Sequence, residues 1–141
     1  MAFRPHPNGG GMVEDTAFVA ETAYVGQHAV VRDGARVLEN ARIDGTAQVY
    51  GYARVTGDAH VSGNANVHGN AYICGNAKIY EQAKVFGSVR IYGAAMVFGY
   101  AHVSGNAWVY GHARVYGWAW VSGSSLVNGH TVLYDAARLY W

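Results

Sequence analysis

Small and aliphatic side chains recur along this chain with a period of six residues. The hexad AQVYGY at residues 47–52 is typical, with Ala in the first position, Val in the third and Gly in the fifth. The register runs from Gly11 to Ala137 without an insertion or a deletion, and every third position is aliphatic. A short fixed period of this kind is the sequence signature of a repeat architecture.

Each hexad predicts one short strand followed by a corner. The alternation Ala-x-Val places two apolar side chains on one face of an extended segment, and the fifth-position Gly reaches the backbone conformation that a corner needs. No Pro occurs after Pro7, which agrees with strands throughout the repeat. One hexad cannot bury its apolar face alone, so successive turns of chain must stack. Six residues per side suit a triangular coil of three hexads, and about seven such coils make a rod of roughly 35 Å.

The spacing from Val49 to Ala53, an aliphatic residue and a small residue four positions later, resembles the hexapeptide repeat of the left-handed parallel β-helix. That family is best known from trimeric acyltransferases that use acyl-CoA or acyl carrier protein. The resemblance covers residues 11–141. It implies an all-β fold, namely a single-stranded left-handed parallel β-helix (a triangular solenoid) of about seven coils of three hexapeptides.

The glycine position departs from the pattern of those enzymes. They often carry Gly directly after the aliphatic residue, whereas here Gly51 follows Val49 by two positions. The Ala-x-Val-x-Gly-Asn sequence pattern is more similar to that of uncharacterised bacterial and phage repeat proteins, which are labelled transferases by their fold. A shared fold does not by itself carry chemistry.

The first ten residues precede the repeat, whereas the last residues of the chain are still in register. Residues 1–10 are rich in Pro and Gly, and we expect them to cap the first coil or to be disordered. Residues 11–141 form the β-helix domain, and the repeat stops in mid-strand. Tyr140 and Trp141 are expected to fold over that end as an aromatic lid, or the end pairs with another chain. We therefore expect a homo-oligomer, either a trimer or an end-to-end dimer.

Charge and composition narrow the classes of partner. The net charge is +1 and only 13% of residues are charged, which argues against nucleic acid and against an anionic membrane surface. No apolar run approaches membrane-spanning or signal-peptide length, so a cytoplasmic protein is expected. The single Cys74 excludes an intrachain disulfide.

Residues 18 apart should lie above one another on neighbouring coils, so the sequence can be read as a map of the surface. Two adjacent columns place aromatic residues together on the C-terminal half: Tyr80, Phe98, Tyr116 and Tyr134 in fourth positions, with Tyr100 and Trp118 in sixth positions. These residues either form a stabilising ladder or mark a contact surface. We predict contact with a protein partner, including self-association, with glycan stacking as a second use.

A third column alternates basic and aromatic side chains. It runs through Arg36, Arg54, Tyr72, Arg90 and Trp108. Such a column suits a nucleic-acid strand or a phosphorylated ligand. The near-neutral net charge favours an ordinary solvated surface instead.

Catalysis is the alternative function, and only the resemblance to hexapeptide-repeat acyltransferases implies it. Those enzymes place a catalytic His between adjacent subunits as general base, and the matching candidates among the seven His are His102, His112 and His130. Acyl-CoA would then lie at the subunit interfaces. However, no extruded loop interrupts the register, and a regular coil offers no concave pocket of its own.

We therefore predict a non-enzymatic structural or binding module that has no cofactor and no metal. The first alternative is a trimeric hexapeptide-repeat acyltransferase using acyl-CoA. The second is a protein that interacts with a glycan, a phage or a host.

Overall fold

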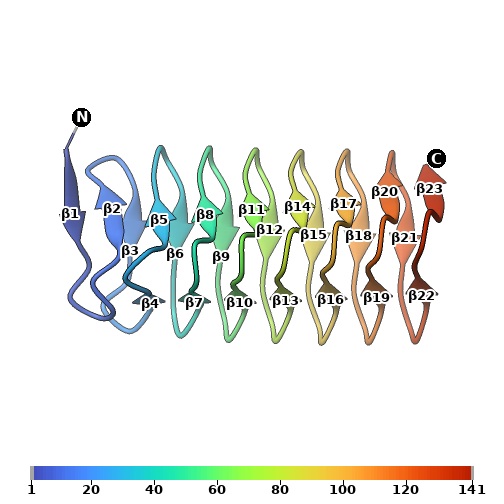
Figure 1. Ribbon diagram of the computed structural model, residues 1–141, viewed down its shortest axis with the longest axis horizontal. Coiled ribbons are helices and arrows are strands. Elements are labelled where there is room, and N and C mark those ends of the chain that lie inside the picture. The colour runs from blue at the N-terminus through green and yellow to red at the C-terminus, as the bar shows by residue number, and fades with distance from the viewer. Residues whose placement is uncertain (1, 141) are drawn as a thin grey trace.

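The chain winds about seven times around one long axis. A computed structural model describes residues 2–140, and it shows coils of similar size following one another from the N-terminal to the C-terminal end (Figure 1). Trp141, half of the expected aromatic lid, lies outside the described residues, as does the side chain of Tyr140. Across residues 2–140 no helix is long and apolar enough to cross a membrane.

Three sheets form the three sides of the coil. Sheet A has nine strands in the order β1 (Phe3–Pro5), β2 (Met12–Glu14), β5 (Val30–Val31), β8 (Gln48–Val49), β11 (Asn66–Val67), β14 (Lys84–Val85), β17 (His102–Val103), β20 (Trp120–Ser122) and β23 (Arg138–Tyr140). Sheet B has seven: β3 (Phe18–Val19), β6 (Arg36–Val37), β9 (Arg54–Val55), β12 (Tyr72–Ile73), β15 (Arg90–Ile91), β18 (Trp108–Val109) and β21 (Leu126–Val127). Sheet C also has seven: β4 (Tyr24–Val25), β7 (Arg42–Ile43), β10 (His60–Val61), β13 (Lys78–Ile79), β16 (Met96–Val97), β19 (Arg114–Val115) and β22 (Val132–Leu133).

From β2 onward, neighbouring strands are parallel and are paired with a shift of one coil. Tyr72, for example, pairs with Arg54 on one side and with Arg90 on the other. The same 18-residue shift holds in all three sheets, which confirms the predicted triangular solenoid of about seven coils. Consequently, each outward position forms a straight column along the axis, at the ~4.8 Å spacing of paired strands.

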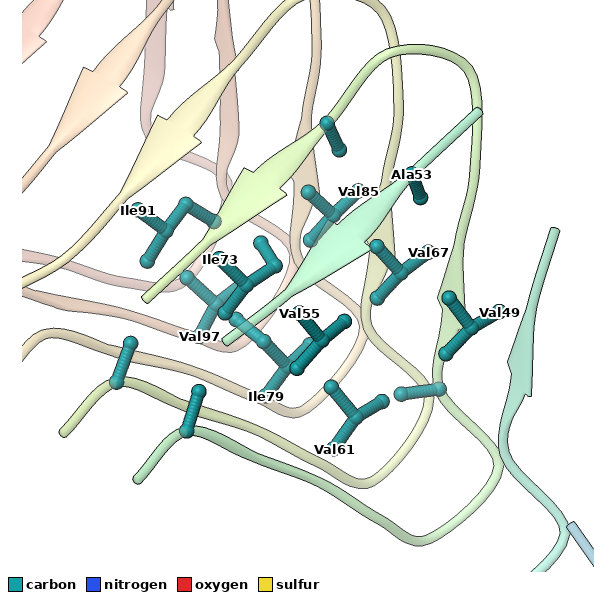
Figure 2. Packing of buried hydrophobic residues seen from close by; sticks show 14 of the residues in the cluster. Val49, Ala53, Val55, Val61, Val67, Ile73, Ile79, Val85, Ile91 and Val97 are labelled. Carbon is teal, nitrogen blue, oxygen red and sulfur yellow. The ribbon is translucent and has the colours of Figure 1, made fainter. Parts of the chain in front are cut away.

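First and third positions of the hexads fill the interior. Ala53, Val55, Ile73 and Ile79 are fully buried, and Figure 2 shows such side chains pointing into the space between the three walls. Small Ala residues alternate with branched Val and Ile residues, so that the three sides meet closely without polar groups. The exception is Ser125, which is buried in a first position and donates a hydrogen bond from Oγ to the carbonyl of Ser122 at 2.7 Å.

The fifth position is left-handed at almost every corner. Gly69 has a φ of 69°, and a Cβ added there would lie 2.7 Å from the amide nitrogen of Gly87 on the next coil. Four acidic residues nevertheless hold this conformation: Asp33, Glu39, Glu81 and Asp135, with φ between 53° and 59°. Residues other than Gly adopt this left-handed backbone conformation at an energetic cost.

Acidic side chains in the first coils satisfy backbone amides at the corners. Glu14, only 3% exposed, accepts a hydrogen bond from the amide of Asp33 at 2.7 Å. Asp33 in turn accepts one from the amide of Gly51 at 3.1 Å, and Glu39 accepts one from Gly57 at 3.2 Å. These acids therefore tie each corner to its neighbour along the axis.

Residues before the repeat cover the first coil. Strand β1 pairs antiparallel with β2, with Arg4 opposite Val13, and it lies at the end of the rod (Figure 1). His6 is 6% exposed, and its Nε2 lies 2.9 Å from the carbonyl oxygen of Ala23. Because a carbonyl only accepts, Nε2 carries the proton. Nδ2 of Asn8 donates to the same oxygen at 3.1 Å.

Candidate functional site

The corner between sheets C and A carries a continuous stack of aromatic rings. The fourth-position side chains Tyr80, Phe98, Tyr116 and Tyr134 follow one another at centroid distances of 4.7, 4.8 and 5.7 Å. Their planes are within 16° of parallel. The parallel register sets this arrangement, because it brings each ring onto the ring one coil earlier. Tyr80, Phe98 and Tyr116 are half-buried by the stack.

A second aromatic pair lies beside this stack and faces outward. Tyr100 and Trp118 occupy sixth positions of the same corner, and their rings stack at 4.3 Å with planes 5° apart. Tyr100 is 49% exposed and Trp118 is 62% exposed. The structure thus brings all the predicted binding residues to one corner. We call this set, comprising Tyr80, Phe98, Tyr100, Tyr116, Trp118 and Tyr134, the aromatic face.

Trp120 extends the aromatic surface onto sheet A. It follows Trp118 by two residues, begins strand β20, is 47% exposed, and stacks on His102 with centroids 4.9 Å apart. The guanidinium of Arg138 lies over its other side at 5.4 Å. The prediction from fourth and sixth positions missed Trp120, although the short separation from Trp118 was a usable signal.

Stacked columns also occur at the other two corners. Between sheets A and B, the guanidinium of Arg32 lies 4.0 Å from the ring centre of Tyr50, and the column continues through His68 and Phe86. Between sheets B and C, Tyr92 stacks on Tyr110 at 4.9 Å. Fourth-position stacking therefore recurs at all three corners of this coil. What distinguishes the aromatic face is the outward pair in sixth positions.

The imidazoles proposed for catalysis lie in two different places, one corner and one sheet. His112 and His130 stack on each other at 5.1 Å between sheets B and C, whereas His102 lies against Trp120. Burial, followed by the nearby charge of Lys84, lowers the pKa of His102, so its neutral form is favoured. Within residues 2–140, none of the three forms a hydrogen bond to a carboxylate, and an orienting partner is a usual part of a general base.

Two further histidines are more enclosed than the sequence indicated. His60 lies in a second position of sheet C between Arg42 and Lys78, and its Nε2 is buried without a hydrogen-bond partner. Burial, together with the charge of Arg42, lowers its pKa. Burial also lowers the pKa of His68, which lies between two aromatic rings. Both side chains favour the neutral form for structural reasons.

The remaining candidates for chemistry are a group of metal ligands and the thiol of Cys74. No group of three or more His, Cys, Asp or Glu residues within 2–140 is arranged to hold a metal ion. Cys74 is half-buried, and burial raises the pKa of its thiol, which disfavours the nucleophilic thiolate.

Surface grooves run along the edges of the coil. One, of about 440 Å³, lies along the edge of sheet B and is lined by Tyr52, Arg54, Asn70, Tyr72, Ser88, Val89 and Arg90. Two others, of about 320 and 360 Å³, adjoin His112 and Arg114 beside sheet C. None of these three grooves is lined by a residue of the aromatic face.

Comparison with known proteins supports the repeat architecture. The sequence model of a family described as YdcK Beta solenoid repeat matches residues 47–63 and 107–123. Each matched segment is 17 residues long, close to one complete coil. No curated protein and no solved structure matched the chain.

Proposed function

We propose that this protein is a non-enzymatic binding scaffold whose aromatic face contacts another protein molecule. One observation carries the proposal: Tyr100 and Trp118 are stacked at 4.3 Å and yet remain 49% and 62% exposed. Tyr and Trp are enriched at the centres of protein interfaces, because they bury a large area at a small cost in side-chain entropy. Stacking fixes these two rings before any partner arrives, which lowers that cost further.

The fold itself does not require these two aromatic residues. Asn64 and Gln82 occupy the same column of the same corner, and the backbone turns there in the same way. The coil can therefore form without the exposed apolar surface that Tyr100 and Trp118 add. Exposed apolar surface in a contiguous patch is characteristic of contact sites.

A second copy of this chain is the protein partner that we test first. A pair of flat stacked rings is complementary to an identical pair, as in the self-complementary interfaces of two-fold dimers. We further propose a left-handed winding for the coil, on the basis of the resemblance to hexapeptide-repeat proteins, and a cytoplasmic location.

Multi-angle light scattering over a range of protein concentrations tests self-association. We expect the wild-type chain to show a mass above the 15.2 kDa of one chain, and the double variant Tyr100→Ala/Trp118→Ala to return toward that value. Tyr52→Ala is the matched control, because Tyr52 is 72% exposed but lies on another corner. A wild-type mass of one chain at every concentration, or the same oligomer in the double variant, would overturn self-association through this face.

A further inference from the structure

The outward face of sheet B differs in chemistry from the other two sheets. Its second positions hold only arginine, aromatic residues and one leucine: Phe18, Arg36, Arg54, Tyr72, Arg90, Trp108 and Leu126. The second positions of sheets A and C also lack acidic residues, but they include histidine, lysine and methionine, which this column does not. The face is thus basic and aromatic, although the whole chain carries a net charge of only +1.

Arginine and tyrosine alternate in the groove at the edge of this sheet. Arg54 and Arg90 are the register partners of Tyr72 on either side, so the two arginines are separated by two strand spacings. Two spacings correspond to about 9–10 Å along the axis. Tyr52 on the neighbouring corner forms a second aromatic wall, and the polar side chains of Asn70 and Ser88 complete the lining.

The arginines in this groove are not neutralised. Among residues 2–140, the ion pairs involve Arg4, Arg32 and Arg42, and neither Arg54 nor Arg90. The guanidinium of Arg90 lies 5.1 Å from the ring centre of Trp108, which positions it, whereas Arg54 has no such contact in the described chain. An unpaired guanidinium facing an open groove favours an anion, and it binds carboxylates and sulfates through charge-assisted hydrogen bonds.

We propose that this groove binds an acidic oligosaccharide in which negatively charged sugars alternate with neutral ones. Arg54 and Arg90 would pair with charges on alternate units, and the neutral unit would lie against Tyr72 and Tyr52. Asn70 and Ser88 offer hydrogen bonds to hydroxyl groups. The groove volume of about 440 Å³ lies within the usual range for a small ligand.

The alternation of charge separates this ligand from a nucleic-acid strand. A nucleic acid carries a phosphate on every unit, and a binding channel usually follows that backbone with continuous positive charge. Here the position between the two arginines is the uncharged Tyr72. The groove lies on sheet B and not on the aromatic face, so this site does not depend on the proposed self-association.

Titration calorimetry at low salt tests the site with three probes of similar length. These are a hyaluronan oligosaccharide, with a carboxylate on alternate sugars, the neutral maltohexaose, and a thymidine oligonucleotide. We expect saturable binding of the hyaluronan probe alone, weakened by added salt. Arg54→Ala/Arg90→Ala should raise its dissociation constant at least tenfold, because two charge-assisted contacts are lost.

Lys84→Ala/Arg114→Ala is the matched control, since it removes the same charge from sheets A and C. It should leave the dissociation constant within about twofold. Circular dichroism confirms that both variants are folded. Absence of hyaluronan binding, or equal weakening by the two double variants, would overturn the proposal. Tighter binding of the oligonucleotide, lost in Arg54→Ala/Arg90→Ala, would assign the groove to single-stranded nucleic acid instead.

Discussion

The carboxylate of Asp33 accepts a hydrogen bond from the amide of Gly51, 18 residues later, at 3.1 Å. Asp33 makes this contact with a backbone φ of 59°. This left-handed conformation costs a residue other than Gly about 1–2 kcal/mol. The bond across the corner offsets part of that cost. Glu81 has the same backbone conformation, with a φ of 58°, and its carboxylate accepts no hydrogen bond within the described residues.

Glu81→Gly is therefore expected to stabilise the protein. The substitution relieves the left-handed strain and removes no hydrogen bond, and the greater freedom of Gly in the unfolded chain offsets part of the gain. We expect the free energy of unfolding to rise by about 0.5–1 kcal/mol in urea denaturation. Asp33→Gly is the comparison, and it should bring no gain because the bond to Gly51 is lost with the strain. Equal stabilisation by the two substitutions would show that the carboxylate of Asp33 contributes nothing.

Gly69→Ala tests the close approach of successive corners. The new Cβ would lie 2.7 Å from the amide nitrogen of Gly87 in addition to the strain at a φ of 69°, so we expect a loss of about 2–3 kcal/mol. Gly129→Ala separates the two effects, since Gly129 has a φ of 60° but an added Cβ meets nothing within 4 Å. It should cost about 1 kcal/mol in the same denaturation assay. Equal losses would mean that the coils adjust freely to the extra carbon.

Phe98→Ala tests whether the inner aromatic stack stabilises the coil. Phe98 is half-buried between Tyr80 and Tyr116, at 4.7 and 4.8 Å, and its removal should cost about 2–3 kcal/mol. Trp118→Ala removes a ring that is 62% exposed and should cost about 1 kcal/mol or less. Thermal denaturation of both variants measures the difference. A large loss in Trp118→Ala would make the outward pair a stabilising element and weaken its proposed role in binding.

His6→Ala should loosen the first coil selectively. The imidazole is buried and donates to the carbonyl of Ala23, so its loss leaves a poorly filled site over the first corner, at a cost of about 1–3 kcal/mol. Amide hydrogen exchange should accelerate in residues 11–26 and stay unchanged in the central coils. His130→Ala, at an exposed corner, is the control. Uniform acceleration along the rod would contradict a local capping role.

Mild acid should destabilise the protein through its enclosed histidines. Burial lowers the pKa of His60, His68 and His102 below the ordinary value of 6.5, so the unfolded chain binds more protons than the folded one. Stability is therefore complete above about pH 6.5 and declines as the pH falls below that value. The melting temperature should drop between pH 7 and pH 5. His68→Phe, which keeps a ring between Tyr50 and Phe86, should reduce this drop in melting temperature. An unchanged pH profile in the variant would show that His68 does not contribute to the loss of stability in acid.

Much of the fold followed from the spacing of Ala and Val residues. An uninterrupted six-residue period fixes which side chains point inward, and the stacking of residues 18 apart then places Phe98 over Tyr80 and Trp118 over Tyr100. Such local and periodic rules apply at each coil, so they can be read without knowing the rest of the structure.

Features outside the period could not be predicted in the same way. The antiparallel pairing of β1 and the burial of His6 depend on contacts of a segment that has no repeat. Asp15 occupies a fifth position of the repeat, but its φ is not left-handed, and its amide donates to the carbonyl of Ala2 in the cap at 3.0 Å. The groove on sheet B likewise requires three strands and a neighbouring corner to be placed together.

The cap formed by β1 gives the rod a direction during its synthesis. The segment that covers the first coil precedes the coils in the chain, so we expect this end to be covered before the later hexads are made. Each further 18 residues then need only pair with the coil already in place, and no distant segment is awaited. We expect such a chain to grow by one coil at a time, with about one triangular cross-section of apolar surface exposed at its growing end.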